Sequence, residues 1–249
     1  MKNLKKIPFI LSILSFLTIF TSANADLKVV ASIKPIHSLA SYLMEGVGKP
    51  SLIVDGYASP HGFALKPSHA KMLQEADIIF WIGEDLENFL EKPLSSIAKK
   101  SEKIELMEAH GLNKLKFRER NIFDDHDDHG HKKKDDHDDH DDHGHKKKDD
   151  HDDHDDHDDH EGHHHGEFDP HIWLDPINAK IILNEMVEHL IENDAKNAST
   201  YKSNLDKALK DIDKLTMEVM TELNQSTSSI VFHDAYQYFE KRFNVNVLG

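Results

Sequence analysis

Short apolar runs alternate with amphipathic segments over the first part of the chain. Four apolar runs rich in β-branched residues suit buried strands: 27–33, 51–54, 77–82 and 103–106. Three segments between them have the spacing of helices: 35–45, 69–76 and 85–99. Pro35 can open the first helix, and Ser68 can cap the second. Strands that alternate with helices in this way predict an α/β lobe with a mainly parallel sheet.

A second set of elements begins after residue 168. Asp175 can cap a helix that starts at Pro176 and runs to about Glu192. From Asp194 onward, apolar residues at three- and four-residue steps predict a longer helix. At about 28 residues it would measure roughly 42 Å, long enough to cross between two lobes.

The end of the chain predicts one strand–helix–strand unit. A strand over 229–232 leads into a helix that opens at His233, and a last strand covers 244–248. One such unit cannot cover both faces of a sheet. We therefore expect an incomplete second lobe, as in a chain truncated at Gly249.

The segment between these two halves has a different composition. Residues 124–167 contain only Asp, Glu, Lys, His and Gly, and the eleven residues 124–134 recur at 138–148. Its 18 Asp and two Glu against six Lys account for −14 of the formal charge of −16, so the remainder is nearly neutral and has no basic stripe for nucleic acid. Such a segment is expected to be disordered without metal. We expect its histidines to form an accessory low-affinity metal loop: His126, His129, His131, His137, His140, His143, His145, His151, His154, His157, His160, His163, His164 and His165.

The first 25 residues have the pattern of a cleavable signal peptide. Lysines precede a mostly apolar stretch over 7–20, and Ala23-Asn24-Ala25 supplies the small-x-small cleavage pattern, which places cleavage after Ala25. The apolar stretch is shorter than the roughly 20 residues that span a bilayer. The chain contains no cysteine, which excludes disulfides and thiolate ligands. We therefore expect export to a periplasm.

Three histidines outside the loop lie where an α/β fold is expected to bind ligands. His61 and His233 each follow a predicted strand, and His171 lies beside Trp173. Each alone also suits a surface, packing or capping role, but together, beside a metal-binding loop, they predict one metal site. Imidazole is a common ligand of transition metals, with Zn²⁺ the commonest candidate.

The surroundings of these histidines divide into shielding residues and structural ones. Phe63 and Trp173 are expected to shield the site, and Asp234 to be an outer hydrogen-bond partner or a cap. Four further histidines are assigned to structure or solvent: His37, His69, His110 and His189.

Three motifs carry a resemblance to a known family: Ser59-Pro-His-Gly-Phe63, Asp169-Pro-His-Ile-Trp-Leu-Asp-Pro176 and Ile230-Val-Phe-His-Asp-Ala-Tyr236. They resemble those of the ZnuA-type proteins, the periplasmic solute-binding components of high-affinity zinc ABC transporters. The resemblance implies zinc capture between two α/β lobes of mainly parallel sheet that a long rigid helix joins, with delivery to an inner-membrane permease. It also implies that His61, His171 and His233 hold the zinc.

The implied division of the chain has six parts: a signal peptide over 1–25, an N-terminal lobe over 26–123, the histidine-rich loop over 124–167, the end of the N-terminal lobe over 168–193, a linking helix over 194–225 and the start of a C-terminal lobe over 226–249. Two departures leave the fourth ligand open. Some relatives have an acidic residue where this chain has Pro60, and a carboxylate that relatives supply would lie beyond Gly249.

Three alternatives remain. A manganese-binding relative would have a glutamate at the position of His233, because manganese prefers more oxygen ligands. A zinc buffer would act through the histidine-rich loop. A zinc hydrolase also uses three ligands and a water, but the chain has no His-Glu-x-x-His motif and no evident general base.

Overall fold

The computed structural model describes residues 26–118, 166–223 and 228–248. The predicted signal peptide lies outside the described residues. So does the predicted histidine-rich loop, apart from Gly166 and Glu167. None of the helices within the described ranges is long and apolar enough to cross a membrane.

Four parallel strands form the sheet of the N-terminal lobe, in the order β2-β1-β3-β4: β1 (Val29–Ala31), β2 (Ser51–Leu52), β3 (Ile78–Trp81) and β4 (Glu102–Glu105). The central strands β1 and β3 are buried along their whole length. Their continuous apolar runs fit strands that are covered on both faces. The predicted parallel sheet is confirmed.

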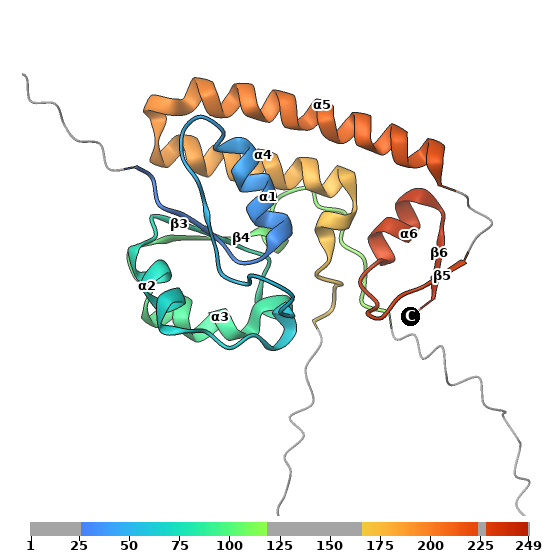
Figure 1. The fold of residues 1–249 in the computed structure, drawn as a ribbon, viewed down its shortest axis with the longest axis horizontal. Coiled ribbons are helices and arrows are strands. Elements are labelled where there is room, and N and C mark those ends of the chain that lie inside the picture. Colours follow the sequence, from blue (N-terminus) through green and yellow to red (C-terminus); the bar gives the residue numbers. More distant parts are fainter. Residues whose placement is uncertain (1–25, 119–165, 224–227, 249) are drawn as a thin grey trace, which may run out of the picture.

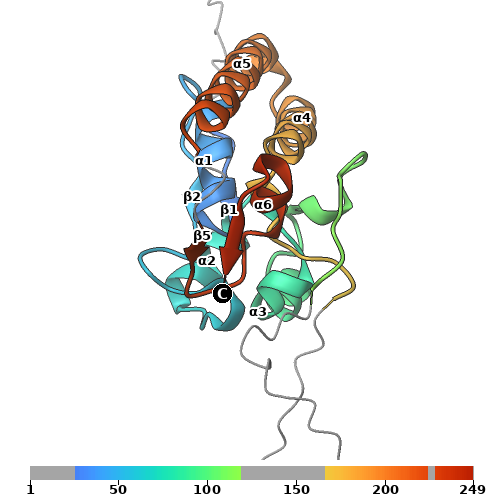
Figure 2. The ribbon, with the colours of Figure 1, turned by 90° about the vertical axis from the view of Figure 1, so that its right-hand side faces the viewer.

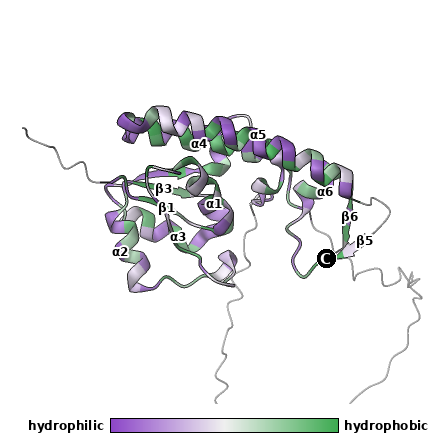
Figure 3. Cartoon of the chain, turned by 45° about the horizontal axis from the view of Figure 1, so that its top comes forward, coloured by the Kyte–Doolittle hydropathy of each residue, from purple (hydrophilic) through white to green (hydrophobic). Residues whose placement is uncertain are grey.

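Helices cover both faces of this sheet (Figure 1). On one side lie α2 (Pro67–Glu75) and α3 (Glu84–Ser96), and on the other lie α1 (Lys34–Leu43), α4 (Pro176–Asn193) and α5 (Ala198–Glu222). The helices α4 and α5 run antiparallel, and α1 packs against both. Hydrophobic colour is concentrated in β1 and β3, whereas α5 carries hydrophilic colour over much of its length (Figure 3).

A small second unit lies beside the end of α5 (Figures 1 and 2). It contains β5 (Ser228–Ile230), α6 (Gln237–Phe243) and β6 (Asn246–Leu248), and its two strands are parallel. Tyr238 joins this unit to the N-terminal lobe, because its buried hydroxyl donates to Asp169 O at 2.8 Å and accepts from Leu115 N at 3.0 Å. The described residues thus have the predicted architecture of a parallel α/β lobe, a long helix and a small second α/β unit.

Two local predictions are wrong. Ser68 is not the cap of α2, because Pro67 already occupies the first helical position and Lys66 precedes it as the cap, with Lys66 N donating to His69 Nδ1 at 3.1 Å. His233 does not open a helix, since α6 begins four residues later.

The strand before His233 also differs from the predicted one, since β5 ends at Ile230 and not at residue 232. The side chains of Ile230 and Phe232 are exposed. Asp175, in contrast, caps α4 as predicted, with its Oδ1 accepting from Ile177 N at 2.9 Å and Pro176 at the first position. A 3₁₀ turn over Ala195–Asn197 precedes α5, so the long helix itself has 25 residues.

Candidate metal centre

The three predicted histidines meet at one point between the lobe and the second unit. His233 Nε2 lies 3.2 Å from His61 Nε2 and 3.3 Å from His171 Nε2. In the described part of the chain, these three imidazoles have ligand atoms within 4.8 Å of one another. No carboxylate of the described residues belongs to this group. The sequence places them 110 and 62 residues apart, so the fold alone brings them together.

Each histidine is held by a short local structure. His61 lies in a 3₁₀ turn over Pro60–Gly62, where its backbone N–H donates to Ser59 Oγ at 3.2 Å. His171 directly precedes the 3₁₀ turn Ile172–Leu174, and His233 lies on the connection from β5 to α6. The ring of His171 is buried, whereas His61 and His233 are exposed, so the centre is open to solvent on one side.

The spacing of the three nitrogens fits a tetrahedral Zn²⁺ ion. Zinc–imidazole bonds of roughly 2.0–2.1 Å at the tetrahedral angle place two ligand nitrogens about 3.3–3.4 Å apart. The two measured separations, 3.2 and 3.3 Å, are close to this value. These separations are compatible with one tetrahedral ion shared by the three rings, with one coordination position left over.

A hollow of about 510 Å³ surrounds the three rings. Its other walls come from the residue before the turn of His61, the start of α3, the two chain segments that flank the histidine-rich loop and the residue after His233: Ser59, Glu84, Asp85, Leu86, Asn88, Phe117, Gly166, Phe168, Pro170 and Asp234. Phe117 N donates to Glu167 O at 3.0 Å, so the two ends of the loop lie side by side at this wall.

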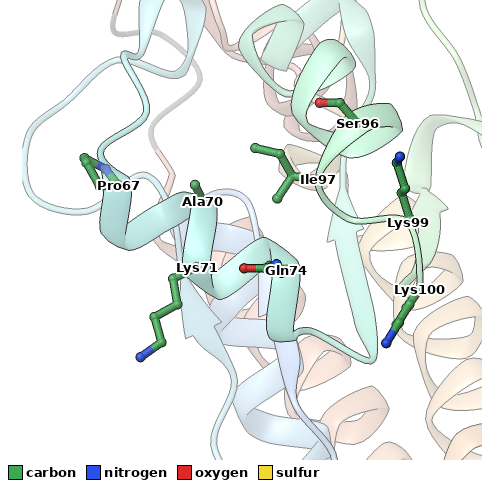
Figure 4. Close-up of a pocket in the computed structure, with 8 residues that line it drawn as sticks. All are labelled: Pro67, Ala70, Lys71, Gln74, Ser96, Ile97, Lys99 and Lys100. Atoms are coloured by element: carbon green, nitrogen blue, oxygen red, sulfur yellow. The ribbon is translucent and has the colours of Figure 1, made fainter.

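A different hollow of about 710 Å³ lies between α2 and the end of α3 (Figure 4). Three lysines line it, Lys71, Lys99 and Lys100, together with neutral side chains. It has no imidazole or carboxylate in its lining, so it does not have the ligands of a metal site.

Asp169 orients the buried histidine. Its Oδ1 accepts from His171 Nδ1–H at 2.7 Å and from the backbone N–H of the same residue at 2.9 Å. This pairing fixes the tautomer of His171, so that Nε2 presents its lone pair toward the other two imidazoles. Sequence reasoning missed Asp169, although its position two residues before His171 allows this local turn.

We expect Asp169→Asn to weaken zinc binding by about tenfold to a hundredfold, because an amide cannot hold the imidazole in this tautomer as strongly as a carboxylate. Chelator competition against zinc would measure the change. Asp77→Asn is a suitable control, since that carboxylate accepts from Lys28 N, far from the centre. Equal zinc affinity in Asp169→Asn and the unaltered protein would contradict the orienting role.

The charges at the centre favour a neutral His233. Partial burial lowers the pKa of this imidazole, and the neighbouring His171 lowers it further. Asp234, which follows it, is held in an ion pair by Arg118, whose Nε lies 3.0 Å from Asp234 Oδ2 and whose Nη1 lies 2.7 Å from Glu240 Oε2. These carboxylates raise the pKa of Arg118. His233 thus keeps a free lone pair at neutral pH.

The other predicted residues lie as follows. The ring of Trp173 packs edge-on against His171, with centroids 5.4 Å apart. Phe63 packs against His69 and Phe89 at 5.4 and 5.3 Å and does not line the hollow. Asp234 lines the hollow but pairs with Arg118, which the sequence reasoning missed because the two are 116 residues apart.

The four histidines assigned to structure or solvent lie outside the centre. His37 Nε2 is 3.1 Å from Pro50 O, His69 is buried at the start of α2, and His110 is exposed. His189 contacts glutamates near the other end of α4.

Comparison with known proteins identifies the family to which the sequence motifs pointed. A profile described as zinc-uptake complex component A, periplasmic (ZnuA), matches residues 29–249. Proteins named high-affinity zinc uptake system protein ZnuA from Brucella abortus and Paracoccus denitrificans are 48% identical over 223 residues and 38% identical over 220 residues. The alignments cover 89% and 88% of this chain but 66% and 64% of the relatives, so the chain spans about two thirds of their length.

A solved structure supports the fold assignment. The crystal structure described as a ZnuA deletion mutant with zinc bound has a TM-score of 0.66 and 22% identity, covering 90% of this chain and 69% of that one. The fold is that of the two-lobed α/β class, and its three converging imidazoles form a candidate metal centre. The chain belongs to the ZnuA family, the periplasmic component of a zinc-uptake complex. This family is a component of a transport system and not a family of enzymes.

Proposed function

We propose that this protein captures Zn²⁺ with high affinity in the periplasm and delivers it to an inner-membrane ABC permease. His61, His171 and His233 are the proposed ligands. The observation that carries the proposal is the convergence of three Nε2 atoms at separations of 3.2 and 3.3 Å. The names of the relatives, high-affinity zinc uptake system proteins, support the choice of metal.

The proposed mechanism is reversible coordination without covalent chemistry. Asp169 holds His171 by its Nδ1–H, which directs Nε2 toward the other two rings, and the lowered pKa of His233 favours the neutral ring that a metal ion requires. His61 is exposed and completes the set from the opposite wall. A water or a carboxylate would occupy the fourth position.

The domain division is part of the proposal. We assign α5 as the link between two lobes and residues 228–248 to the second lobe. The signal peptide over 1–25, with cleavage after Ala25, is proposed as the route of export, in agreement with the periplasmic location in the family's description. The loop over 124–167 is proposed to bind further zinc weakly.

Manganese and hydrolysis are the less favoured alternatives. The ligand atoms of the centre are imidazole nitrogens within 4.8 Å of one another. In the described part of the chain this group contains no carboxylate. A set of nitrogen ligands suits zinc better than manganese. The carboxylates next to two of the ligands are engaged, Asp169 by His171 and Asp234 by Arg118. Neither is free to act as the general base of a hydrolase.

Zinc titration calorimetry on a variant that lacks residues 124–167 tests the proposed function. We expect one tight zinc site and weak manganese binding, because the loop supplies none of the three converging imidazoles. The deletion should leave the fold intact, since Asp169 N donates to Leu115 O at 2.9 Å and Lys116 pairs with Phe168, and all four residues lie outside the deleted segment. A manganese titration is the parallel control.

Absence of a tight zinc site in the folded deletion variant would contradict the proposal. Zinc buffering through the histidine-rich loop would then become the better assignment. Tight manganese binding with weak zinc binding would instead favour the manganese alternative.

A further inference from the structure

A second group of metal-ligand side chains lies toward the end of α4, away from the three histidines. Glu102, His189 and Glu192 have ligand atoms within 4.8 Å of one another. His189 Nδ1 lies 2.7 Å from Glu102 Oε1 and 3.9 Å from Glu192 Oε2. On the other side of the ring, His189 Nε2 lies 3.3 Å from Glu185 Oε1.

The sequence of α4 places three of these side chains on one face. Glu185, His189 and Glu192 follow one another at steps of four and three residues, which brings them together on a helix. Glu102 joins them from the first residue of β4. Asn193 Nδ2 donates to Glu102 Oε2 at 2.6 Å, so the carboxylate from the strand is held in place beside the imidazole.

The group has more negative than positive charge. Within the described ranges, the ion pairs found for Glu102, Glu185 and Glu192 all go to His189, and none goes to a lysine or arginine within 4.0 Å. Even if His189 were protonated, the group of one imidazole and three carboxylates would have a net charge of −2. Like charges at such separations repel unless a cation lies between them. A divalent ion held by Glu102, Glu192 and a neutral His189 would form a neutral unit.

The arrangement around His189 resembles the one around His171. In the centre described above, Asp169 accepts from one ring nitrogen and leaves the other for the metal. Here His189 Nδ1 lies 2.7 Å from Glu102 Oε1, the distance of an Nδ1–H donor, and a metal ion would replace that proton while Glu185 accepts from Nε2–H. The imidazole therefore has both a carboxylate that sets its tautomer and two carboxylates that could share an ion with it.

We propose that Glu102, His189 and Glu192 form a second site for a divalent transition metal, distinct from the three-histidine centre. His189 lies 13 residues beyond Pro176 on α4, about 20 Å along the helix axis. Figure 1 shows α4 running from the side of the second unit toward the turn into α5. One nitrogen and two carboxylates form a harder donor set than three imidazoles, so Mn²⁺ binds here in preference to the centre.

Paramagnetic broadening by Mn²⁺ tests this site on the full chain. In ¹⁵N-labelled protein, added Mn²⁺ should broaden the amide signals of residues near 102 and 185–193 selectively. Because broadening is local to the ion, metal bound elsewhere does not obscure the result. Replacing both carboxylates (Glu102→Gln with Glu192→Gln) should raise the Mn²⁺ concentration needed by more than about tenfold.

Glu91→Gln with Glu188→Gln is the matched control, since it removes the same two charges from exposed positions. Its broadening should equal that of the unaltered protein. Unchanged broadening in the double variant, or no selective broadening in the unaltered protein, would overturn the proposal and leave His189 as an ion-paired imidazole. His233→Ala should keep the broadening near His189, so failure of the three-histidine centre and failure of this site give different results.

Discussion

We expect the His233→Ala variant to lose tight zinc binding and to keep only weak binding by the histidine-rich loop. Its Nε2 lies between those of His61 and His171, at 3.2 and 3.3 Å, so its removal leaves two imidazoles without their shared neighbour. Loss of an outer hydrogen-bond partner costs about tenfold to a hundredfold in metal affinity. Loss of a ligand should exceed a hundredfold. Calorimetry should show that the tight class of sites disappears.

His110→Ala provides the matched control, because it removes an exposed histidine after β4. Its tight zinc site should be unchanged. Thermal unfolding of both variants without zinc should match that of the unaltered protein, which separates ligand loss from misfolding. A tight site that survives in folded His233→Ala would show that the three-histidine assignment is wrong.

The second large effect concerns Glu87, a fully buried carboxyl in α3. Its Oε2 accepts from Ile82 N and Gly83 N, both at 3.0 Å, and its Oε1 accepts from Ser32 Oγ. Burial raises the pKa of this carboxyl to about 7 despite these hydrogen bonds, and the charge of Glu105 contributes in the same direction.

The raised pKa of Glu87 makes stability depend on pH. Between about pH 4.5 and pH 7 the folded protein holds a proton that the unfolded chain releases, so the free energy of unfolding falls as pH rises. The stabilisation is fully present below about pH 4.5 and is lost as pH passes the folded pKa. A shift of this size corresponds to about 3 kcal/mol. Glu87→Gln stays neutral and should remove this dependence.

Urea unfolding at pH 5 and pH 8 measures this effect. We expect Glu87→Gln to be more stable than the unaltered protein at pH 8, by up to about 3 kcal/mol, and similar to it at pH 5. Glu91→Gln, at an exposed position of the same helix, should follow the unaltered protein. Equal differences between Glu87→Gln and the unaltered protein at both pH values would contradict a titrating Glu87.

Much of the fold could be predicted from apolar patterning. The runs that became β1 and β3 are continuous because these strands are buried on both faces. Helix starts were less predictable. At α2, Pro67 sets the first helical position, and this outweighs the capping preference of Ser68.

The three histidines could be found because each lies in a motif next to a predicted element. Their partners could not all be found in the same way. Asp169 has a local signal, two residues from His171, but Arg118 reaches Asp234 across 116 residues. For Glu87 a signal existed, since it shares a helix face with the buried Leu90 and Leu94. For His189, the glutamates of its own helix were visible, whereas Glu102 came from a distant strand.

The pairing of Phe117 with Glu167 has a consequence for how this protein can change over evolution. The two ends of the loop are fixed beside each other, whatever lies between them. The entropy of closing a flexible segment between fixed ends grows only with the logarithm of its length. Losing one 14-residue period changes the folding free energy by only about 0.3 kcal/mol. The repeat number of this loop can therefore change with almost no effect on stability, so that any selection on it would act through the proposed weak metal binding.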